Sequence, residues 1–339
     1  ICLHNFYMIL TNLSRASAPA KVVLFGEHFV VYGSPAILGS IDRRIRVSAQ
    51  IIRPAKINIR SDTGFFASFA ANKLDGYGTN WSEAQKFTYP LYFAAQEIIR
   101  GSLNAKDAKL GVEIDIHSDI PYGIGLGSSA ASCVATVAAV GSLFLKRDRH
   151  WIFKRAHQAE RLIHKSSSGG DCYVSTFGGL IYYVTNGKKR KIKTRRSVSL
   201  ILVNTGIKHS TKALVSLVEN FRNQNTSLFD DLANSATHIC DQAALALTED
   251  NPVKLGRLMS RNHRLLETLG VSTVETDNLV RYCLDSGAYG AKLTGAGGGG
   301  SVIALVPDEC KTEFEHKLLK KYSYQYIPVQ IKSYGLLKY

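Results

Sequence analysis

Paired cysteines, long apolar runs and a secretory leader are all missing from this chain of 339 residues. Its six cysteines are scattered without a Cys-x-x-Cys pair, which argues against a disulfide framework or a zinc site and indicates a reducing cytoplasm. No apolar stretch approaches the length needed to cross a bilayer, so we expect no membrane association. Residues 1–10 lack the basic start and small-residue cleavage site of a signal peptide, and we treat residues 1–15 as an uncertain extension.

Acidic residues are also few: the chain has 27 Asp and Glu and 42 Lys and Arg, which gives a formal net charge of +15. Much of the excess lies in the segment Lys188–Arg196, between two strand-like runs. Such a cluster could bind nucleic acid, but it carries no interleaved aromatic residues for base stacking. We therefore interpret it as a solvated sheet edge and expect no nucleic-acid partner. The positive field as a whole suits a triphosphate and a carboxylate substrate.

The length and periodicity of the chain predict two lobes of α+β structure. The first hundred residues are rich in strand-like runs, among them Phe29–Tyr32, and residues 82–99 form a helical pattern that we expect to break at Pro90. Further helices and strands alternate to the end of the chain. Pro328 lies within the last predicted strand, which places that strand at a sheet edge.

The most informative segment is Pro121–Ala131, where three glycines and two serines precede the apolar run Cys133–Val140. Glycines let backbone N–H groups crowd around an anion, and the helix that follows points its positive end at the same place. The segment is neither a Walker-type loop nor a dinucleotide fingerprint. It predicts a cradle for nucleotide phosphates, and the alternative is a flexible turn that opens a buried helix.

Two further motifs accompany this loop. Ala18–Gly33 runs a short apolar strand into a Gly-Glu-His turn, and Lys292–Ile303 places a glycine run at the mouth of another strand. In this order and spacing the three motifs resemble those of the GHMP small-molecule kinases, and the form of the first motif is that of the mevalonate kinases. The resemblance extends from about Ser17 into the 330s.

The resemblance implies a two-lobed fold with an active site between the lobes. Residues 1–195 are expected to form a lobe of the ribosomal-protein-S5-like type, and residues 196–339 a ferredoxin-like lobe. The implied reaction is phosphorylation of the C5 hydroxyl of mevalonate to 5-phosphomevalonate, with ATP as co-substrate and Mg²⁺ as cofactor. A homodimer is expected only from the family. The residues implied to hold the ATP phosphates are Pro121, Gly123, Gly125, Leu126, Gly127, Ser128, Ser129 and Ala130.

Phosphoryl transfer requires a group that orients or deprotonates the nucleophile and a cation near the reacting oxygens. Asp171, on a Gly-Gly turn, occupies the position of the family's catalytic aspartate, and Lys21 that of its lysine partner. The alternatives are a turn-capping aspartate and a solvated lysine. Around Asp171 the chain departs from the family pattern at Lys165, Ser167 and Cys172.

The resemblance implies that Glu160 and Ser129 hold the magnesium ion. Carboxylate and hydroxyl oxygens suit this hard cation. Residue chemistry alone does not distinguish Ser129 from Ser128, and Glu160 could instead be an exposed helix glutamate paired with a basic neighbour.

Substrate contacts are implied for Glu27, His28 and Thr205, in addition to Lys21 and Asp171. Lys212 is a weaker candidate, because a helix cap at Ser210 or Thr211 explains most of that segment. We expect the glycines Gly295, Gly297 and Gly298 to pack near the phosphate loop and complete the nucleotide site, although glycines at a strand start also serve close backbone packing.

Three other functions remain open at this point. A sister kinase would act on phosphomevalonate, on homoserine or on a different hydroxyl of mevalonate. A non-catalytic sensor of the same fold would not need Lys21, Glu160 and Asp171 together. A nucleic-acid-binding protein would show steeply salt-dependent binding.

Overall fold

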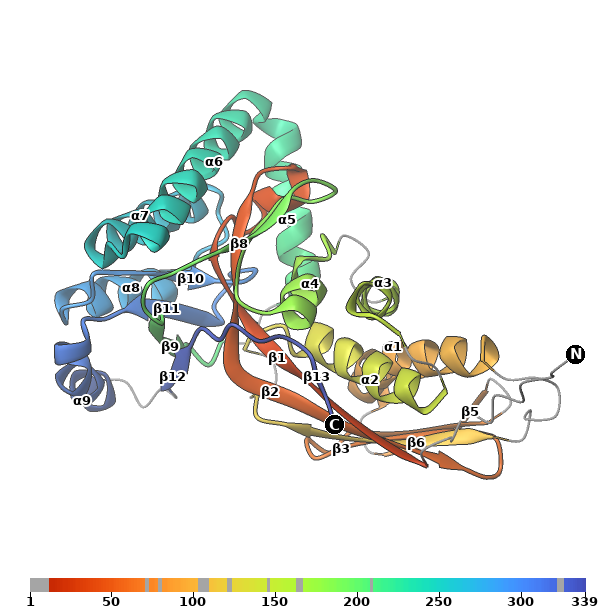
Figure 1. The fold of residues 1–339 in the computed structure, drawn as a ribbon. Helices are drawn as coiled ribbons and strands as arrows, with labels where there is room; N and C mark the ends of the chain where they lie inside the picture. Colours follow the sequence, from red (N-terminus) through yellow and green to blue (C-terminus); the bar gives the residue numbers. More distant parts are fainter. Residues whose placement is uncertain are drawn as a thin grey trace, which may run out of the picture.

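The computed structural model describes residues 12–70, 73–78, 81–102, 110–120, 124–144, 147–162, 167–207, 210–321 and 326–339. Two sheets organise these residues, a larger one at the bottom of Figure 1 and a smaller one at its left. The long strands β1 (Leu13–Phe25) and β2 (Ala36–Ile52) run from the larger sheet up to the level of the smaller one. Segments at the upper ends of these strands can therefore reach both parts of the molecule.

The larger sheet has nine strands in the described residues, in the order β13-β1-β2-β6-β3-β4-β5, with β7 paired to β2 and β8 to β7. Its remaining strands are β3 (Lys56–Ser61), β4 (Phe66–Ala70), β5 (Lys73–Tyr77), β6 (Gly111–Ser118), β7 (Leu180–Tyr183), β8 (Lys189–Ile192) and β13 (Leu337–Lys338). The helices that accompany it are η1 (Phe29–Tyr32), α1 (Trp81–Arg100), α2 (Ser128–Phe144), α3 (Arg149–Glu160) and α4 (Gly170–Phe177).

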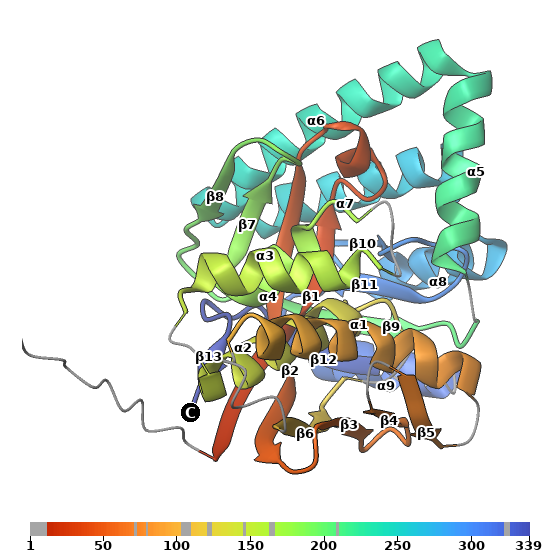
Figure 2. The same ribbon diagram turned by 90° about the vertical axis from the view of Figure 1, so that its right-hand side faces the viewer.

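Helix α2 is the central helix of this part of the chain. Almost all of its residues are buried, since it packs on β1 and β2 and is flanked by α1, α3 and α4. Figure 2 shows these helices layered over the sheet. A helix that is apolar on all sides belongs inside a protein, so the Cys133–Val140 run explains its position. Its first residues, Ser128 and Ser129, are therefore presented from a rigid base.

The smaller sheet has the order β10-β11-β9-β12, and all its neighbouring strands are antiparallel. Numbered along the chain the order is 2-3-1-4, which is that of a ferredoxin-like sheet, as predicted. Pro328 lies in the edge strand β12, as expected. The elements of this part are β9 (Ser199–Asn204), α5 (Thr211–Gln224), α6 (Thr226–Glu249), α7 (Pro252–Thr268), α8 (Val274–Asp285), β10 (Gly290–Thr294), β11 (Ser301–Leu305), η3 (Asp308–Cys310), α9 (Lys311–Lys321) and β12 (Tyr326–Gln330).

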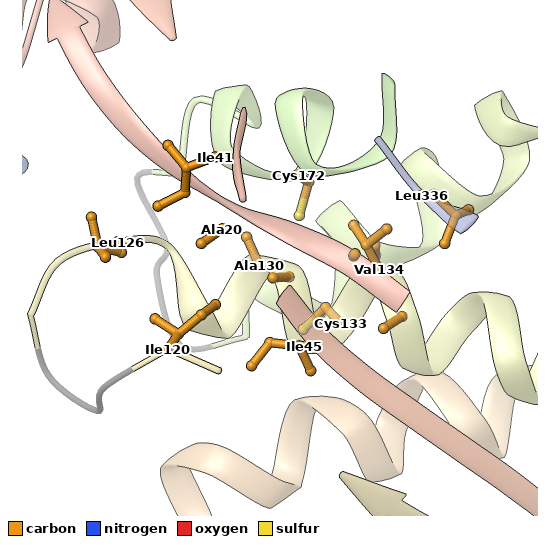
Figure 3. Close-up of a cluster of buried hydrophobic side chains, with 14 of the residues drawn as sticks. Ala20, Ile41, Ile45, Ile120, Leu126, Ala130, Cys133, Val134, Cys172 and Leu336 are labelled. Atoms are coloured by element: carbon orange, nitrogen blue, oxygen red, sulfur yellow. The ribbon is translucent and has the colours of Figure 1, made fainter. Parts of the chain in front are cut away.

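One hydrophobic cluster runs through both parts, from the larger sheet and α2 to residues of β9, α6 and α7. The close-up in Figure 3 shows its section around the start of α2, where Cys172 of α4 lies near Ala130 and Cys133, and Leu126 lies on the loop that precedes the helix. The predicted boundary at 195/196 falls between β8 and β9 and stays a prediction. After β12 the chain returns to the larger sheet, because β13 pairs with β1.

Two local predictions were wrong. Helix α1 continues through Pro90, although proline removes a helical hydrogen bond at a cost of about 3 kcal/mol or more. The carbonyl that loses its partner belongs to Lys86, an exposed residue, whereas Pro90, Leu91 and Ala95 are buried. Residues Phe29–Tyr32 form a 3₁₀ helix, not a strand, because the chain turns sharply at His28 and Phe29 packs against Phe229 of α6.

The basic segment contributes the strand β8, which pairs only with β7 among the described residues and so forms one arm of a hairpin, and most of the segment is exposed. The described cysteines are all free. Within the described part of the chain, no helix combines the length and apolar character required to span a membrane.

Candidate active site

The phosphate loop turns sharply into α2. Gly125 and Gly127 have φ angles of +78° and +70°, which side chains other than glycine rarely adopt, and the Ala131 N–H donates to the Gly127 carbonyl at 3.0 Å to begin the helix. The N–H groups of this turn and the start of a helix of 17 residues form an environment that favours an anion. The predicted residues Pro121 and Gly123 lie outside the described residues.

Lys21 and Asp171 form an ion pair, with 3.2 Å between Nζ and Oδ2. Lys21 follows an irregularity in the pairing of β1 with β2 between Pro19 and Lys21, and such a bulge redirects the side chains beside it. The Ser175 hydroxyl of α4 donates to the Pro19 carbonyl at 2.9 Å, which fixes α4 against the bulge. The Lys21 side chain is 6% exposed and that of Asp171 34%, so the carboxylate remains accessible to a ligand.

The phosphate loop directly contacts this ion pair. The Lys21 N–H donates to the Leu126 carbonyl at 2.9 Å. A β-carbon placed on Gly127 would lie 2.9 Å from Lys21 Cγ and 3.5 Å from Asp171 Oδ2. The loop, the lysine and the aspartate therefore form one compact site, with space for nothing larger than glycine at residue 127.

We expect Gly127→Ala to lower kcat/KM for the chain's reaction on the order of 10²-fold, because the added methyl displaces Lys21 from Asp171. The matched control is Gly64→Ala, since Gly64 also has a positive φ (+91°) but an added β-carbon there meets nothing within 4 Å. Steady-state kinetics and thermal unfolding of both variants test this. Equal losses of activity in the two variants would mean that backbone strain, not the clash, is responsible.

Glu160 lies at the end of α3 and is buried, contrary to the alternative of an exposed helix residue. Its Oε2 accepts hydrogen bonds from the Ser167 hydroxyl (2.9 Å) and the Cys172 thiol (3.3 Å). Ser167 and Cys172 are two of the positions that depart from the family pattern, and here both donate to the same oxygen. Burial, and then the negative charge of Asp171, raise the pKa of Glu160 from 4.5 to about 7.

This shift predicts a pH-dependent stability of the metal-free protein. Glu160 binds its proton more tightly in the folded chain, where its pKa is about 7, than in the unfolded chain, where it is 4.5. Protonated Glu160 therefore stabilises the fold fully below pH 4.5, and the free energy of unfolding falls by about 3 kcal/mol as the pH rises through 7. Urea unfolding with a chelator at pH 5 and pH 8 measures it. Glu160→Gln should lose much less stability than the wild type over this range, and parallel losses would contradict the prediction.

Glu27 and His28 follow β1, and both lie at the boundary with the second sheet. The Glu27 carboxylate is buried in an ion pair with Lys292 and also accepts from Asn262 Nδ2 at 3.1 Å. Both of its oxygens are thus bonded within the protein, and its role as a substrate contact stays a prediction. His28 Nε2 is bonded to the Ala296 carbonyl at 2.8 Å, and burial lowers the pKa of its imidazole.

The late glycine run packs next to the phosphate loop, as expected. Gly295 lies close to the Gly125 carbonyl, and the Ser301 hydroxyl donates to the Ile124 carbonyl at 2.9 Å. Gly297 and Gly298 pack on Val271, and the Gly298 N–H donates to its carbonyl at 2.7 Å.

Thr205 uses its hydroxyl to support this same run. It donates to the Gly300 carbonyl at 3.0 Å and accepts from the Ile207 N–H at 3.3 Å. The hydroxyl is buried, and its role as a substrate contact stays a prediction. The Ser210 side chain caps α5, which leaves Lys212 on an exposed part of that helix, as in the simpler interpretation.

A second cluster of ionisable residues, His263, Glu267 and Asp277, lies apart from this site, and its ligand atoms are within 4.8 Å of one another. The Leu293 N–H donates to His263 Nδ1 at 3.4 Å, so the neutral ring carries its proton on Nε2, the atom 3.2 Å from the Asp277 carboxylate. Burial, followed by the charge of Lys292, lowers the pKa of His263 to about 4. Nε2 is buried and, although it lies 3.2 Å from the Asp277 carboxylate, it makes no hydrogen bond of good geometry among the described residues.

The structure thus brings together Lys21, Asp171 and the described part of the phosphate loop, with Glu160 linked to the Asp171 turn through Ser167. It also reveals residues that sequence reasoning missed: Ser175, Asn262, Lys292, Thr294 and Ser301. Thr294 exchanges hydrogen bonds with the backbone of Val23 at 3.0 and 3.1 Å. Pro19 inside a strand was an available signal for the bulge, because proline in a strand marks an edge or an irregularity. For Asn262, Lys292, Thr294 and Ser301, no pattern in the neighbouring sequence indicated these contacts.

Family models match both parts of the chain. The model described as "GHMP kinases N terminal domain" matches residues 91–179, and that described as "GHMP kinases C terminal" matches residues 243–323. A mevalonate kinase of Pyrococcus abyssi is 39% identical over 310 residues, which cover 88% of this chain and 90% of that protein. A mevalonate kinase of Saccharolobus solfataricus is 31% identical over 331 residues, which cover 95% and 98%.

Solved structures agree with these matches. The mevalonate kinase of Methanococcus jannaschii superposes with a TM-score of 0.74 at 30% identity, covering 94% of this chain and 98% of that one. The L. major mevalonate kinase in complex with R-mevalonate has a TM-score of 0.78 at 27% identity, covering 94% and 96%. A Lactococcus lactis galactokinase, at 20% identity and a TM-score of 0.78, shares the fold.

Proposed function

This chain belongs to the GHMP kinase family, within its mevalonate kinases, and on that premise we propose that it transfers the γ-phosphate of ATP to the C5 hydroxyl of mevalonate. The observation that carries the proposal is the contact of the Lys21–Asp171 ion pair with Gly127 of the phosphate loop. This contact supports the proposal because a nucleotide held by the loop would then present its terminal phosphate to an alcohol beside a base, Asp171, and a cation, Lys21.

Asp171 accepts the proton of the attacking hydroxyl as its oxygen bonds to the γ-phosphorus of ATP, and the bond from that phosphorus to the bridging oxygen breaks to release ADP. Its carboxylate suits this role because it is partly exposed and sits in the first turn of α4, behind a Gly-Gly turn without side chains. Lys21, 3.2 Å from the carboxylate, stabilises the negative charge that develops between the two reactants.

The phosphate loop binds and aligns the nucleotide. The backbone N–H groups around Gly125 and Gly127 and the N-terminus of α2 face the phosphates, and Leu126 and Ala130 anchor the loop in the core. The run at Gly295, Gly297 and Gly298 supports the opposite side. His28 and Thr205 line the substrate side in this proposal.

Glu160 and Ser129 are the residues that would hold Mg²⁺. The fit rests on Glu160, a buried carboxylate that feels the negative charge of Asp171 and has a pKa raised to about 7, because such a site gains from an added cation. When bound, the ion neutralises the phosphate oxygens and so lowers the barrier to transfer. The hydrogen bonds from Ser167 and Cys172 both occupy Oε2 and thereby orient the carboxylate.

The proposal is tested by measuring ATP consumption with Mg²⁺ against mevalonate, phosphomevalonate and homoserine, and by locating the phosphate on the product by ³¹P NMR. We expect turnover with mevalonate and phosphate on C5. Phosphate on another carbon, or turnover only with another alcohol, would assign the chain to a sister activity. ATP binding without turnover of any alcohol would favour a sensor. A reducing cytoplasm and a homodimer stay predictions.

A further inference from the structure

The turn that carries His28 is strained. His28 has φ 59° and ψ −51°, and the Phe29 N–H donates to the Glu27 carbonyl at 2.6 Å, across a single residue. This is a γ-turn with positive φ, a rare conformation for a residue with a side chain. Such strain persists only where the surroundings enforce it, and it is concentrated at functional sites.

The turn is enforced from the other part of the molecule. The Glu27 side chain is 1% exposed, and its Oε1 forms an ion pair with Nζ of Lys292, whose side chain is 0% exposed. Lys292 lies in β10, at the entry to the glycine run. Asn262 of α7 donates to the second carboxylate oxygen at 3.1 Å. Both oxygens of Glu27 are therefore held by residues of the second sheet and its helices.

The side-chain amide of Asn262 is oriented to bond Glu27, at the cost of leaving its own oxygen without a partner among the described residues. With Nδ2 on the carboxylate, Asn262 Oδ1 is buried and has no hydrogen-bond partner among the described residues. In the opposite amide orientation, Asn262 Oδ1 would lie against the Glu27 carboxylate, and two acceptor oxygens cannot form a hydrogen bond. An unsatisfied buried acceptor destabilises a fold, so the bond to Glu27 outweighs it.

The contacts of Glu27 also fix the position of the neighbouring His28 side chain. With Glu27 held, the turn projects the imidazole onto the Ala296 carbonyl of the glycine run, at 2.8 Å. Lys292 and Ala296 lie on the same strand-loop segment, so the segment that anchors the turn also receives its imidazole. The far side of the turn rests on α6, where Phe29 and Phe229 have ring centroids 5.7 Å apart.

We propose that Lys292 and Asn262 are positioning residues that clamp Glu27 and thereby set His28 in its substrate-facing geometry. The inference rests on the proposed function, because it assumes that His28 serves the phosphate-accepting substrate. Glu27 contributes through this clamp and not by direct contact with the substrate.

The test separates positioning from stability. Lys292→Met alone leaves a buried unpaired carboxylate and is expected to destabilise the chain. Glu27→Gln with Lys292→Met removes both charges and keeps an acceptor for Asn262, so this double variant should unfold within a few degrees of the wild type. We expect its KM for mevalonate to rise about tenfold or more, with the KM for ATP changed less than about twofold.

His28→Ala supplies the control for the route of the effect. Because the clamp acts through His28, adding the double substitution to His28→Ala should change the KM for mevalonate less than about twofold further. A folded double variant with the wild-type KM, or effects that multiply on the His28→Ala background, would overturn the proposal.

A readout without substrate distinguishes this inference from the proposed function. The pKa of His28 lies below 6.5 because the imidazole is buried, while Glu27 and Ala296 oppose that shift. NMR titration of His-labelled protein should show this pKa rising in the double variant, as the released imidazole becomes solvated. Since the loss of the Glu27 charge alone would lower it, an unchanged or lower value refutes the clamp. A rise in a chain inactive on mevalonate would refute only the proposed function.

Discussion

Asp171→Asn is expected to lower kcat on the order of 10³-fold while the affinity for ATP changes little. The amide cannot accept the proton of the attacking hydroxyl, and general-base groups contribute about 10²- to 10⁴-fold to such reactions. Asp171 also keeps Lys21 in place at 3.2 Å, so part of the loss reflects the released lysine. ATP binding should persist, because in the proposed site the phosphates are held by the backbone of the loop around Gly125 and Gly127.

The measurement combines steady-state kinetics with calorimetric titration of a non-hydrolysable ATP analogue. Asp75→Asn is the matched control, since Asp75 also pairs with a lysine, Lys56, at 2.8 Å but on the exposed edge of the larger sheet. Exposed pairs contribute little, so this variant should keep wild-type turnover. Wild-type turnover in Asp171→Asn itself would refute the assignment of the base.

Glu160→Gln is expected to raise the Mg²⁺ concentration for half-maximal activity at least about tenfold. The Ser167 and Cys172 donors both point at Oε2, so the glutamine carbonyl oxygen will occupy that position and its NH₂ group the other. An NH₂ group cannot ligate a cation. The substitution therefore removes the proposed ligand atom with little change in shape.

Titrating activity with Mg²⁺ at saturating ATP tests this, and Mn²⁺ binding followed by electron paramagnetic resonance gives a readout that does not depend on turnover. Glu97→Gln is the control, because Glu97 lies in the exposed pair with Arg155 on neighbouring helices. If the magnesium curve of Glu160→Gln coincides with that of the control, Glu160 is not a ligand.

Much of the proposed site could be predicted because its parts are short local motifs. A glycine-rich turn before an apolar helix specifies an anion site wherever it occurs, since backbone N–H groups and the helix N-terminus lie within a few residues. Asp171 and Lys21 were found in the same way, from their own motifs. The α+β class and the edge position of Pro328 follow from local patterns as well.

The errors arose where distant contacts overruled local preference. Pro90 lies within a continuous helix because α1 packs its apolar face on α2, which outweighs one missing hydrogen bond. The strand-like residues Phe29–Tyr32 form a 3₁₀ helix because the turn at His28 is clamped. The ion pair of Glu27 was not predicted, because its partner Lys292 is 265 residues away in the chain.

The sequence by itself determined the family of this protein, the class of its reaction and the residue types of its site, because these depend on side-chain chemistry and on spacings of a few residues. The sequence also predicted the pairing of Lys21 with Asp171, which the structure confirms. Only the tertiary structure decided which other groups face one another: Ser167 and Cys172 on one oxygen of Glu160, and Lys292 and Asn262 on Glu27. The physical reason is that such buried polar pairs are specified by desolvation and hydrogen-bond geometry between segments far apart in the chain.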